Sequence, residues 1–291
     1  MEKLRLTGGV RYDLDTFIHP TLSPRFAIIY QPASEHTFRA GVSVGYRPPT
    51  LAETYQQYSV AVSLPPPIPP SRPTLVLAGA NPEPEKIVSY EAEYQGWYFN
   101  HRLRGRAALF FNHITDLIAS RQVSPDVSRN TNDPGQADIY GGEAGFDFLA
   151  TRWLTGYANV AYQEIGQSFT GTARRGAPQF KWNLGARADW DNGLSAEIDY
   201  HYVGAATYPI NQAFFSFAPF GVTPPNERVG SYNLLNLRGG YKFWKQKASA
   251  GYLREAEVAI SAFNALDDKH KEHPLGDTIG SRVMGWLTVR F

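Results

Sequence analysis

The sequence contains no cysteine, which excludes a disulfide framework and a thiolate metal site. It has no excess of either charge, with 28 basic and 27 acidic residues, so nothing in its balance points to a nucleic-acid partner. Its seven histidines show no metal-ligand spacing, and no Gly-x-Ser-x-Gly elbow occurs. We therefore expect neither a cofactor nor a resident metal, and no catalytic residue.

A long hydrophobic run is also missing, because no stretch approaches the roughly 20 apolar residues that a membrane helix requires. This does not exclude a membrane β-barrel, whose strands expose only alternate residues to lipid. Residues 1–9 lack the apolar core of a secretory signal peptide. An outer-membrane protein needs such a signal. Either the chain is mature or truncated, therefore, or it is not an outer-membrane barrel.

Aromatic residues, in contrast, make up 14% of the chain, and polar and apolar residues alternate with a period of two along most of it. The alternation is clearest over residues 87–99, 182–190 and 194–202. It predicts strands with one apolar and one polar face. Repeated charges on the polar face, and aromatic residues near the ends of the apolar face, favour a lipid-facing wall around a watery lumen over a soluble sandwich.

The last nine residues, 283–291, show this pattern in its most informative form. Val283, Leu287, Val289 and Phe291 share an apolar face, and the residues between them form a mixed face. A strand of this kind with a terminal phenylalanine is typical of the last strand of a bacterial outer-membrane barrel. We expect Val289 and Phe291 to act as its C-terminal assembly signal.

The pattern predicts about twelve strands joined by alternating short and long connections. The strands begin near Leu4, Arg25, Thr37, Ile87, Leu103, Ala137, Leu154, Phe180, Leu194, Tyr232, Val258 and Val283. If Phe291 is placed on the periplasmic side and the strands are counted back from it, every short turn lies in the periplasm and every long loop lies outside the cell. Membrane barrels have this arrangement. Trp97, Trp153, Trp190 and Trp244 lie near periplasmic turns, where an interfacial girdle is expected.

Six segments, in this order, resemble motifs in the C-terminal part of TonB-dependent outer-membrane receptors. They are Gly45-Tyr-Arg-Pro-Pro-Thr-Leu-Ala-Glu-Thr-Tyr55, Asn81-Pro-Glu-Pro-Glu-Lys86 with Ser89-Tyr90-Glu91, Asn112-His-Ile-Thr-Asp-Leu-Ile118, Ile139-Tyr-Gly-Gly-Glu143, Phe263-Asn-Ala-Leu-Asp-Asp268 and Ile279-Gly-Ser-Arg-Val283. No one motif is decisive, but the ordered set is highly specific. The resemblance extends along the whole chain.

The resemblance implies an all-β fold, an antiparallel transmembrane β-barrel. Members of the family carry a plug domain, a TonB box and a 22-stranded barrel, and this chain offers no candidate for the first two. We therefore expect residues 1–291 to form a single partial domain, about the last 12 strands of such a barrel without its plug. Closure as a smaller barrel is the alternative, but nothing in the sequence indicates redesign for closure.

The function that the resemblance implies is energy-coupled uptake of a scarce ligand, with iron transport by siderophore uptake the expected case. The partners would be outer-membrane lipid, the TonB energy-coupling protein through the missing plug, the barrel-assembly machinery through the last strand, and a small ligand such as a ferric siderophore. The location would be the outer membrane of a Gram-negative cell. No histidine lies between residues 47 and 81, which argues against haem.

Two sets of candidate residues follow from this interpretation. Candidate ligand contacts on the long loops are Tyr55, Tyr58, Arg174, Arg175, Tyr208, Phe214 and Phe217. Candidate lumen- or plug-facing charges are Glu91, Glu93, Arg104, Arg106, Glu143, Asp147, Arg187, Asp189, Glu197, Asp199 and Arg238. The alternative role for these charges is to hydrate and cross-brace the lumen, and for the loop residues it is to pack within the loops.

Two rival functions remain open at this stage. A passive porin would need a loop folded into the pore, which the sequence does not reveal. An outer-membrane phospholipase would need a serine beside a histidine near the outer rim. His113 has the right location, but neither Ser120 nor Ser124 is clearly placed to be its nucleophile. We therefore predict that the protein is not an enzyme.

Overall fold

The computed structural model describes residues 3–14, 16, 19–60, 74–79, 81–124, 127–169, 176–210, 225–247 and 253–290. Its main feature is a 12-stranded antiparallel sheet. The strands are β1 (Leu4–Asp13), β2 (Thr21–Ala33), β3 (His36–Arg47), β6 (Glu85–Tyr98), β7 (Leu103–Thr115), β10 (Gln136–Leu149), β11 (Leu154–Gln167), β12 (Phe180–Asp189), β13 (Leu194–Val203), β16 (Tyr232–Lys247), β17 (Leu253–Phe263) and β18 (Arg282–Arg290).

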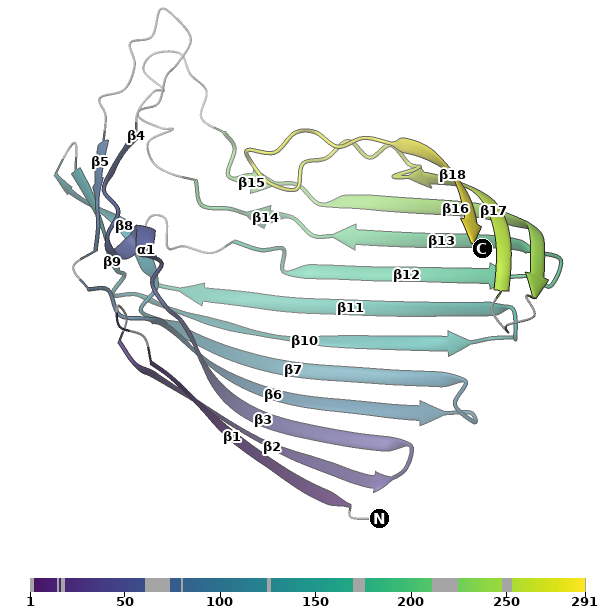
Figure 1. Cartoon of the computed structure of the whole chain (residues 1–291), viewed down its shortest axis with the longest axis horizontal. Coiled ribbons are helices and arrows are strands. Elements are labelled where there is room, and N and C mark those ends of the chain that lie inside the picture. Colours follow the sequence, from purple (N-terminus) through teal and green to yellow (C-terminus); the bar gives the residue numbers. More distant parts are fainter. Residues whose placement is uncertain are drawn as a thin grey trace, which may run out of the picture.

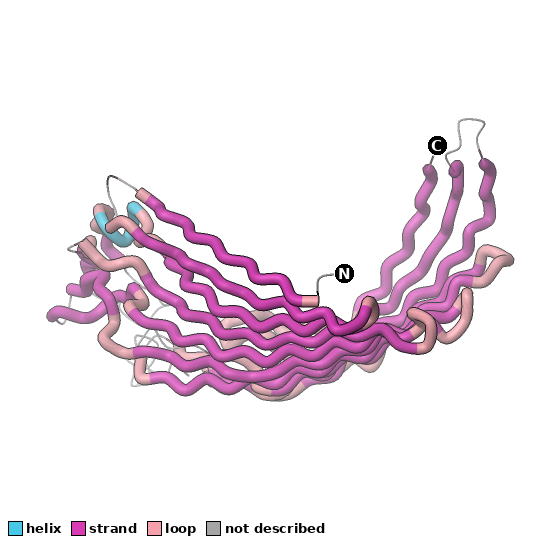
Figure 2. The backbone as a smooth tube through the Cα atoms, turned by 90° about the horizontal axis from the view of Figure 1, so that it is seen from below, coloured by secondary structure: helices cyan, strands magenta, loops and turns pink. Residues whose placement is uncertain are grey.

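The sheet is an open trough one layer thick (Figures 1 and 2). Each strand pairs with the next main strand along the chain, so the order across the sheet follows the sequence. β1 and β18 form its two edges and do not pair with each other. The prediction of an antiparallel barrel-type sheet is confirmed, and the sheet is not closed.

Short turns lie at one end of the trough and long loops at the other (Figure 1). Ser34 and Glu35 join β2 to β3, and Gly193, at φ 89°, closes the turn between β12 and β13. Only glycine adopts that conformation freely, which explains the Asp-Asn-Gly sequence there. We call these the turn end and the loop end.

The loop end carries additional structure that the alternation of residues did not predict. A second, four-stranded sheet has the order β4–β5–β9–β8, formed by β4 (Tyr58–Val60), β5 (Thr74–Leu77), β8 (Ile118–Ser124) and β9 (Val127–Asn132). A two-stranded sheet pairs β14 (Ala206–Thr207) with β15 (Arg228–Val229), and a short helix, α1, spans Leu51–Thr54. No helix among the described residues is long and apolar enough to cross a membrane.

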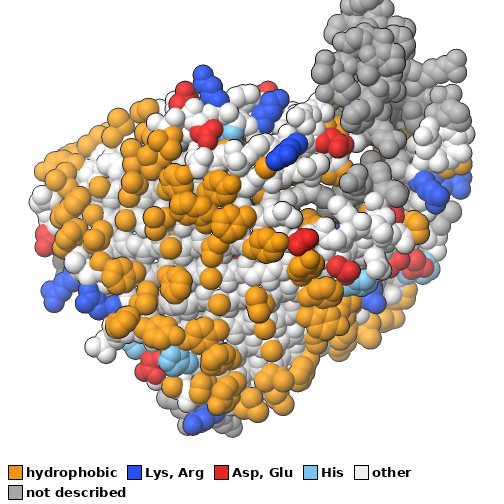
Figure 3. Space-filling model, turned by 180° about the vertical axis from the view of Figure 1, so that it is seen from behind, with side chains coloured by type: hydrophobic (Ala, Val, Ile, Leu, Met, Phe, Trp, Pro, Cys, Tyr) orange, Lys and Arg blue, Asp and Glu red, His pale blue; other side chains and the backbone are white. Residues whose placement is uncertain are grey.

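The two faces of the trough differ in chemistry. On the convex face, hydrophobic side chains cover the strands and charges gather near the margins (Figure 3). Leu6, Phe26 and Ile28 belong to this face and are 60%, 45% and 40% exposed. The concave face carries the alternating polar positions. Because a one-layer sheet buries neither face, no large side chain among the described residues is fully buried.

The predicted strand starts agree with the observed strands except at two places. β2 begins at Thr21, before the expected Arg25, and β17 begins at Leu253, before the expected Val258. Pro24 interrupts the first pattern, but pairing of β2 with β3 starts only at Arg25, so the missing N–H of Pro24 costs no bond on that side. At the start of β17, the charged residues at 254, 255 and 257 obscure the alternation of polar and apolar residues.

Gly141 provides a test of the close strand packing in the Tyr-Gly-Gly-Glu segment. A Cβ at this position would meet the carbonyl oxygen of Tyr162 and lie 2.8 Å from Cζ of Phe110. We predict that Gly141→Ala lowers the free energy of unfolding by about 1–3 kcal/mol, the usual cost of overpacking. Urea unfolding in detergent micelles, followed by tryptophan fluorescence, measures this.

Gly239→Ala is the matched control, since a Cβ there has nothing within 4 Å. This variant should unfold close to the wild-type midpoint. Equal effects of the two substitutions would contradict the packing argument.

Candidate functional site

The strand register places every one of the predicted lumen-facing charges on the concave face. Across β3 and β6, the guanidinium of Arg39 donates hydrogen bonds to Glu91 at 3.1 Å and Glu93 at 2.8 Å. Across β7 and β10, Asp147 lies 2.6 Å from Arg104 and 3.3 Å from Arg106. Most of these charges therefore brace neighbouring strands.

Charge pairs continue toward the C-terminal edge. Arg187 donates to Asp189 at 2.7 Å within β12, and Arg238 pairs with Glu257 across β16 and β17. Glu255 on β17 pairs with Arg290 on the edge strand. An exposed pair such as Arg187 with Asp189 contributes only about 0–1 kcal/mol. Glu255 and Glu257 are more buried, with side chains 8% and 16% exposed.

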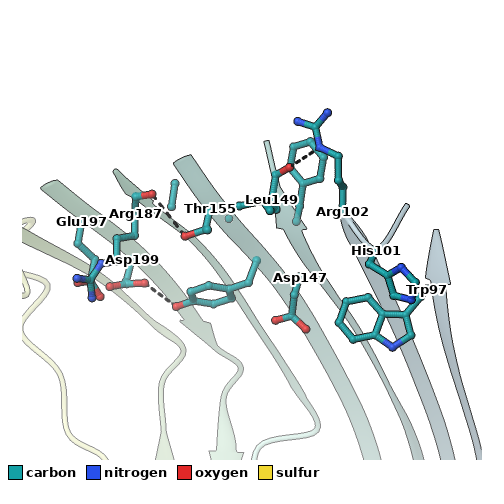
Figure 4. A pocket seen from close by; sticks show the side chains of 13 residues that line it. Trp97, His101, Arg102, Asp147, Leu149, Thr155, Arg187, Glu197 and Asp199 are labelled. Carbon is teal, nitrogen blue, oxygen red and sulfur yellow. Dashed lines mark hydrogen bonds between the residues drawn. The ribbon is translucent and has the colours of Figure 1, made fainter. Parts of the chain in front are cut away.

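Three of the predicted acidic residues differ, because they have no ion pair among the described residues: Glu143, Glu197 and Asp199. Tyr157 donates its hydroxyl to Asp199 at 2.6 Å, and Glu197 lies two positions away on the same face of β13. Both line a hollow of about 340 Å³ near the turn end (Figure 4). The hollow thus carries two neighbouring carboxylates without a direct ion pair, and Arg187 and Arg238 lie opposite Glu197 on the adjacent strands.

Trp97 lines the same hollow, on the side opposite Glu197 (Figure 4). The guanidinium of Arg104 lies 5.5 Å from the centre of its indole ring. The expectation that Trp97 belongs to a lipid-facing girdle is therefore wrong, because the alternation of β6 directs it to the concave face. The convex face of β6 instead carries Tyr94 and Tyr98 at this end, beside Phe38 of β3 and His36.

The loop end is organised by Arg47, for which the sequence suggested no role beyond its motif. Its Nε and Nη2 atoms donate to the two carboxylate oxygens of Glu85, both at 2.6 Å. Nη1 and Nη2 also donate to Glu53, both at 3.1 Å. Oε1 of Glu85 also accepts the backbone N–H of Ile118 at 2.9 Å, which links the start of β8 to the same cluster. Arg47 and Glu85 together thus connect three motif segments.

Glu53 also caps helix α1. Thr50 accepts the Glu53 backbone N–H at 3.2 Å, and Glu53 accepts the Thr50 N–H at 2.7 Å, a capping box. Burial by itself raises the pKa of Glu53. The hydrogen bonds from Arg47 and Thr50 outweigh that effect and hold the pKa below its ordinary value of 4.5.

Asn132 completes this connection from the end of β9. Its side-chain amide donates to the carbonyls of Asp116 at 2.6 Å and Glu83 at 2.9 Å, and its oxygen accepts the Glu83 N–H at 2.8 Å. The segments that begin at Gly45, Asn81 and Asn112 therefore meet in space. We call Arg47, Glu53, Glu85 and Asn132 the rim junction.

The candidate ligand contacts lie on separate parts of the loop end. Tyr55 follows α1 and is 57% exposed, and Tyr58 begins β4. Tyr208 follows β14, and its ring lies 5.4 Å from that of His273. Arg174, Arg175, Phe214 and Phe217 lie outside the described residues. Of the assembly signal, Val289 is on the convex face of β18, opposite Ala256, and Phe291 lies outside the described residues.

The structure also shows where the candidate residues of the alternative function, an outer-membrane phospholipase, lie. Nδ1 of His113 is 2.7 Å from Asp138, across β7 and β10. Ser120 lies in β8 of the second sheet, opposite Asn130. Among the described residues no hydrogen bond joins His113 to Ser120 or Ser124, and no group of three or more histidine or acidic residues could hold a metal ion.

Comparison with known proteins gives a family match and a set of similar structures. The family model described as TonB dependent receptor-like, beta-barrel, matches residues 1–264. A search of curated proteins found no match.

Among solved structures, the siderophore receptor PirA from Acinetobacter baumannii has a TM-score of 0.73 and 16% identity, covering 97% of this chain and 43% of the receptor. A mutant of the ferric enterobactin receptor PfeA from Pseudomonas aeruginosa gives 0.71 and 16%, covering 98% and 42%. The FrpB iron transporter from Neisseria meningitidis gives 0.68 and 16%, covering 97% and 42%. The chain thus has the fold of these proteins and spans about two fifths of their length.

The rim junction predicts that Arg47→Gln destabilises the protein. The substitution removes the cation that Glu85, whose side chain is only 12% exposed, needs as its partner. We expect the free energy of unfolding to fall by about 1–3 kcal/mol, and limited proteolysis at the loop end to become faster. Arg11→Gln is the control, because the Arg11–Asp13 pair is largely exposed and its loss should cost less than about 0.5 kcal/mol. Equal decreases in the free energy of unfolding for Arg47→Gln and Arg11→Gln would contradict a special role of the rim junction.

The lowered pKa of Glu53 predicts a pH dependence with a definite sign. A carboxyl whose pKa is lower in the folded state stabilises that state fully above its unfolded pKa, and the contribution disappears as the pH falls through the folded pKa. The stability difference between wild type and Glu53→Gln should therefore stay constant from about pH 7 to 5 and shrink below about pH 4.5. Urea midpoints measured across this range test it; a difference that already vanished above about pH 6 would refute the assignment.

Proposed function

We propose, from the premise that the chain belongs to the TonB-dependent receptor β-barrel family, that it forms the C-terminal part of an outer-membrane transporter that takes up a scarce ligand with energy delivered through TonB. The observation that carries the proposal is the open 12-stranded sheet with an apolar convex face and a charged concave face. The family is one of bacterial outer-membrane receptors and transporters rather than enzymes.

The two faces and two ends then acquire a direction in the membrane. The convex face meets lipid, and the concave face lines the lumen. The turn end lies in the periplasm and the loop end outside the cell, since membrane barrels have short periplasmic turns and long external loops. In this orientation the rim junction stands at the external mouth of the lumen.

The two edge strands support a partial barrel. The outward-facing N–H and C=O groups of β1 and β18 need partners, because lipid supplies no hydrogen bonds. Further strands that pair with β1 and β18 would satisfy both edges, giving the 22 strands of plugged transporter barrels. We therefore propose that residues 1–291 are one partial domain, completed by the first strands and by a plug.

The carboxylates without an ion pair support a partner inside the lumen. Glu143, Glu197 and Asp199 form no ion pair among the described residues, whereas most other lumenal charges do. Burying such groups against a plug requires cationic side chains from that plug. TonB would act through the same plug, and the barrel-assembly machinery would bind β18, with Val289 and Phe291.

A ferric siderophore is the proposed ligand. The support is indirect: a ferric enterobactin receptor and a siderophore receptor have this fold. Exposed Tyr55 and Tyr58, together with Tyr208, Phe214 and Phe217, offer flat surfaces, and Arg174 and Arg175 offer positive charge for an anionic ferric complex. The loop end is where such a complex would first make contact.

The test is uptake of radioactive iron in cells that lack their own siderophore receptors. The intact gene product should restore uptake from at least one of a panel of catecholate, hydroxamate and carboxylate siderophores. An uncoupler of the proton-motive force, or deletion of TonB, should reduce that uptake to background. Uptake that persists both with the uncoupler and without TonB would indicate a passive channel.

The isolated chain is the matched control. Residues 1–291 expressed alone with a secretion signal should give no uptake, because the edges and the lumen are incomplete. Restored uptake by this chain alone would refute the partial-barrel proposal.

A further inference from the structure

Three polar side chains form a hydrogen-bonded series on the convex face near the turn end. Nδ1 of His36, the first residue of β3, lies 2.9 Å from the hydroxyl oxygen of Tyr94, and that hydroxyl is hydrogen-bonded to the hydroxyl of Tyr98. Strand alternation places all three on the side of Phe38, whose ring lies 4.8 Å from that of Tyr94. Figure 3 shows histidine side chains among hydrophobic ones at this margin. The series therefore crosses from β3 to β6 on the outer surface of the trough.

Gly96 makes room for this series. It is the residue of β6 that lies opposite His36, and it comes between Tyr94 and Tyr98 on the same face. A Cβ at this position would collide with the Tyr94 hydroxyl and lie 3.0 Å from Nδ1 of His36. The ring of Tyr94 therefore leans over Gly96 toward the turn end, which a residue with a side chain would prevent.

The series has one more hydrogen-bond donor than it uses. A neutral His36 and two tyrosine hydroxyls supply three donors, and the two bonds within the series use two of them. The third emerges at one of the two ends, the hydroxyl of Tyr98 or Nε2 of His36. Neither group has a further partner among the described residues, and Tyr98 is 39% exposed. The spare donor is therefore accessible to an acceptor from outside the chain.

The turn that follows Tyr98 has an unusual backbone and an exposed aromatic ring. Phe99, Asn100 and His101 have φ angles of 54°, 53° and 64°, in the left-handed region that side chains rarely adopt. Strain of this kind concentrates at functional sites. Phe99, the first residue of the turn, is 74% exposed. Such an apolar ring is stabilised where it can leave water.

Arg102 ends this turn and gives it a positive charge. Its backbone N–H donates to the Tyr98 carbonyl at 3.1 Å, so the two residues are held together. Its guanidinium donates to the carbonyls of Leu149 and Ala150, and it forms no ion pair with a carboxylate of the described residues. Figure 4 shows the guanidinium pointing away from Asp147, and hence out of the lumen.

We propose that Tyr98 and Arg102 bind the phosphodiester of a phospholipid headgroup at this margin of the convex face. The Tyr98 hydroxyl donates to a phosphate oxygen, and Tyr94 and His36 donate in sequence behind it. Arg102 supplies the opposite charge on the same turn. The acyl chains of the lipid lie along the apolar strands, and Phe99 lies at the level of the headgroup.

The proposal rests on the proposed membrane orientation, in which the turn end faces the periplasmic leaflet. It differs from a general aromatic girdle, which needs only amphipathic rings at the interface. A girdle requires neither a connected series of donors nor a cation without an ion pair. Selectivity for phosphate is therefore the property that distinguishes the two.

The probe is dioctanoyl phosphatidylglycerol, whose headgroup carries an anionic phosphodiester, and dioctanoylglycerol is the matched compound without phosphate. Native mass spectrometry of the full-length gene product in dodecyl maltoside micelles counts the bound lipids and measures their affinity. ¹³Cε1-labelled histidine locates them by NMR, because a phosphate at Tyr98 changes the hydrogen bonding of His36 through Tyr94. We expect saturable binding of the phospholipid with a shift of the His36 resonance, and neither effect with dioctanoylglycerol.

Two substitutions remove the proposed contacts separately. Tyr98→Phe keeps the ring and removes the donor, so the affinity for the phospholipid should fall about tenfold. Arg102→Gln can keep a bond to a backbone carbonyl but loses the charge, so the affinity should fall and should depend less on ionic strength. Tyr30→Phe is the matched control, since Tyr30 is 45% exposed on the same face beside Phe38 and lies outside the series. Its affinity should equal that of the wild type.

Equal affinity of the wild type, Tyr98→Phe and Arg102→Gln would overturn the site. Equal binding of the two lipids would also overturn it, because only a general girdle would then remain. The result is separable from uptake. Lipid binding without energy-dependent uptake would keep the site and reject the transporter, and energy-dependent uptake with unchanged lipid binding in both variants would do the reverse.

Discussion

The constraint on which the structure depends is that backbone hydrogen bonds in a one-layer sheet are made only between neighbouring strands. No second layer covers either face, and among the described residues the buried apolar cluster is confined to Leu117, Ala137 and Phe169, near the loop end. The convex face is apolar along its length, so the sheet has no protein core on that side. Within the described 12-stranded sheet every interior strand pairs on both sides, and β1 and β18 pair on one side.

The concave face follows from the same constraint. Because the convex side of the strands is apolar, the charged side chains gather on the other side, where Arg39, Asp147 and Arg238 pair with charges on adjacent strands. Such pairing leaves little free charge to contact anything else. Glu197 and Asp199, beside the hollow of Figure 4, form no direct ion pair, although Arg187 and Arg238 lie opposite Glu197 on the adjacent strands.

The loop end has its own organisation, and it gives the family motifs a physical meaning. Arg47 and Asn132 tie together three segments that are far apart in the sequence, and Asn264 with Asp268 anchors a fourth. The motif residues therefore build the base on which the external loops stand. The exposed aromatic residues Tyr55 and Tyr58 lie at or beyond this base.

The sequence by itself determined the number of main strands, their direction across the sheet, and which residues share a face. Alternation is a local property, because consecutive side chains of a strand point to opposite faces whatever lies beyond. The charges of 187–199 and the apolar residues of 283–289 could therefore be placed without a structure.

Only the tertiary structure decided what the long connections do. The second sheet pairs β5 with β9 across about fifty residues of sequence. Helix α1 is too short to show a helical period in the sequence. The stacking of His270 on Tyr232 and the contact of Arg47 with Glu85 likewise join residues that are far apart in the sequence. No local period encodes such contacts, because they depend on where the strands beneath deliver each loop.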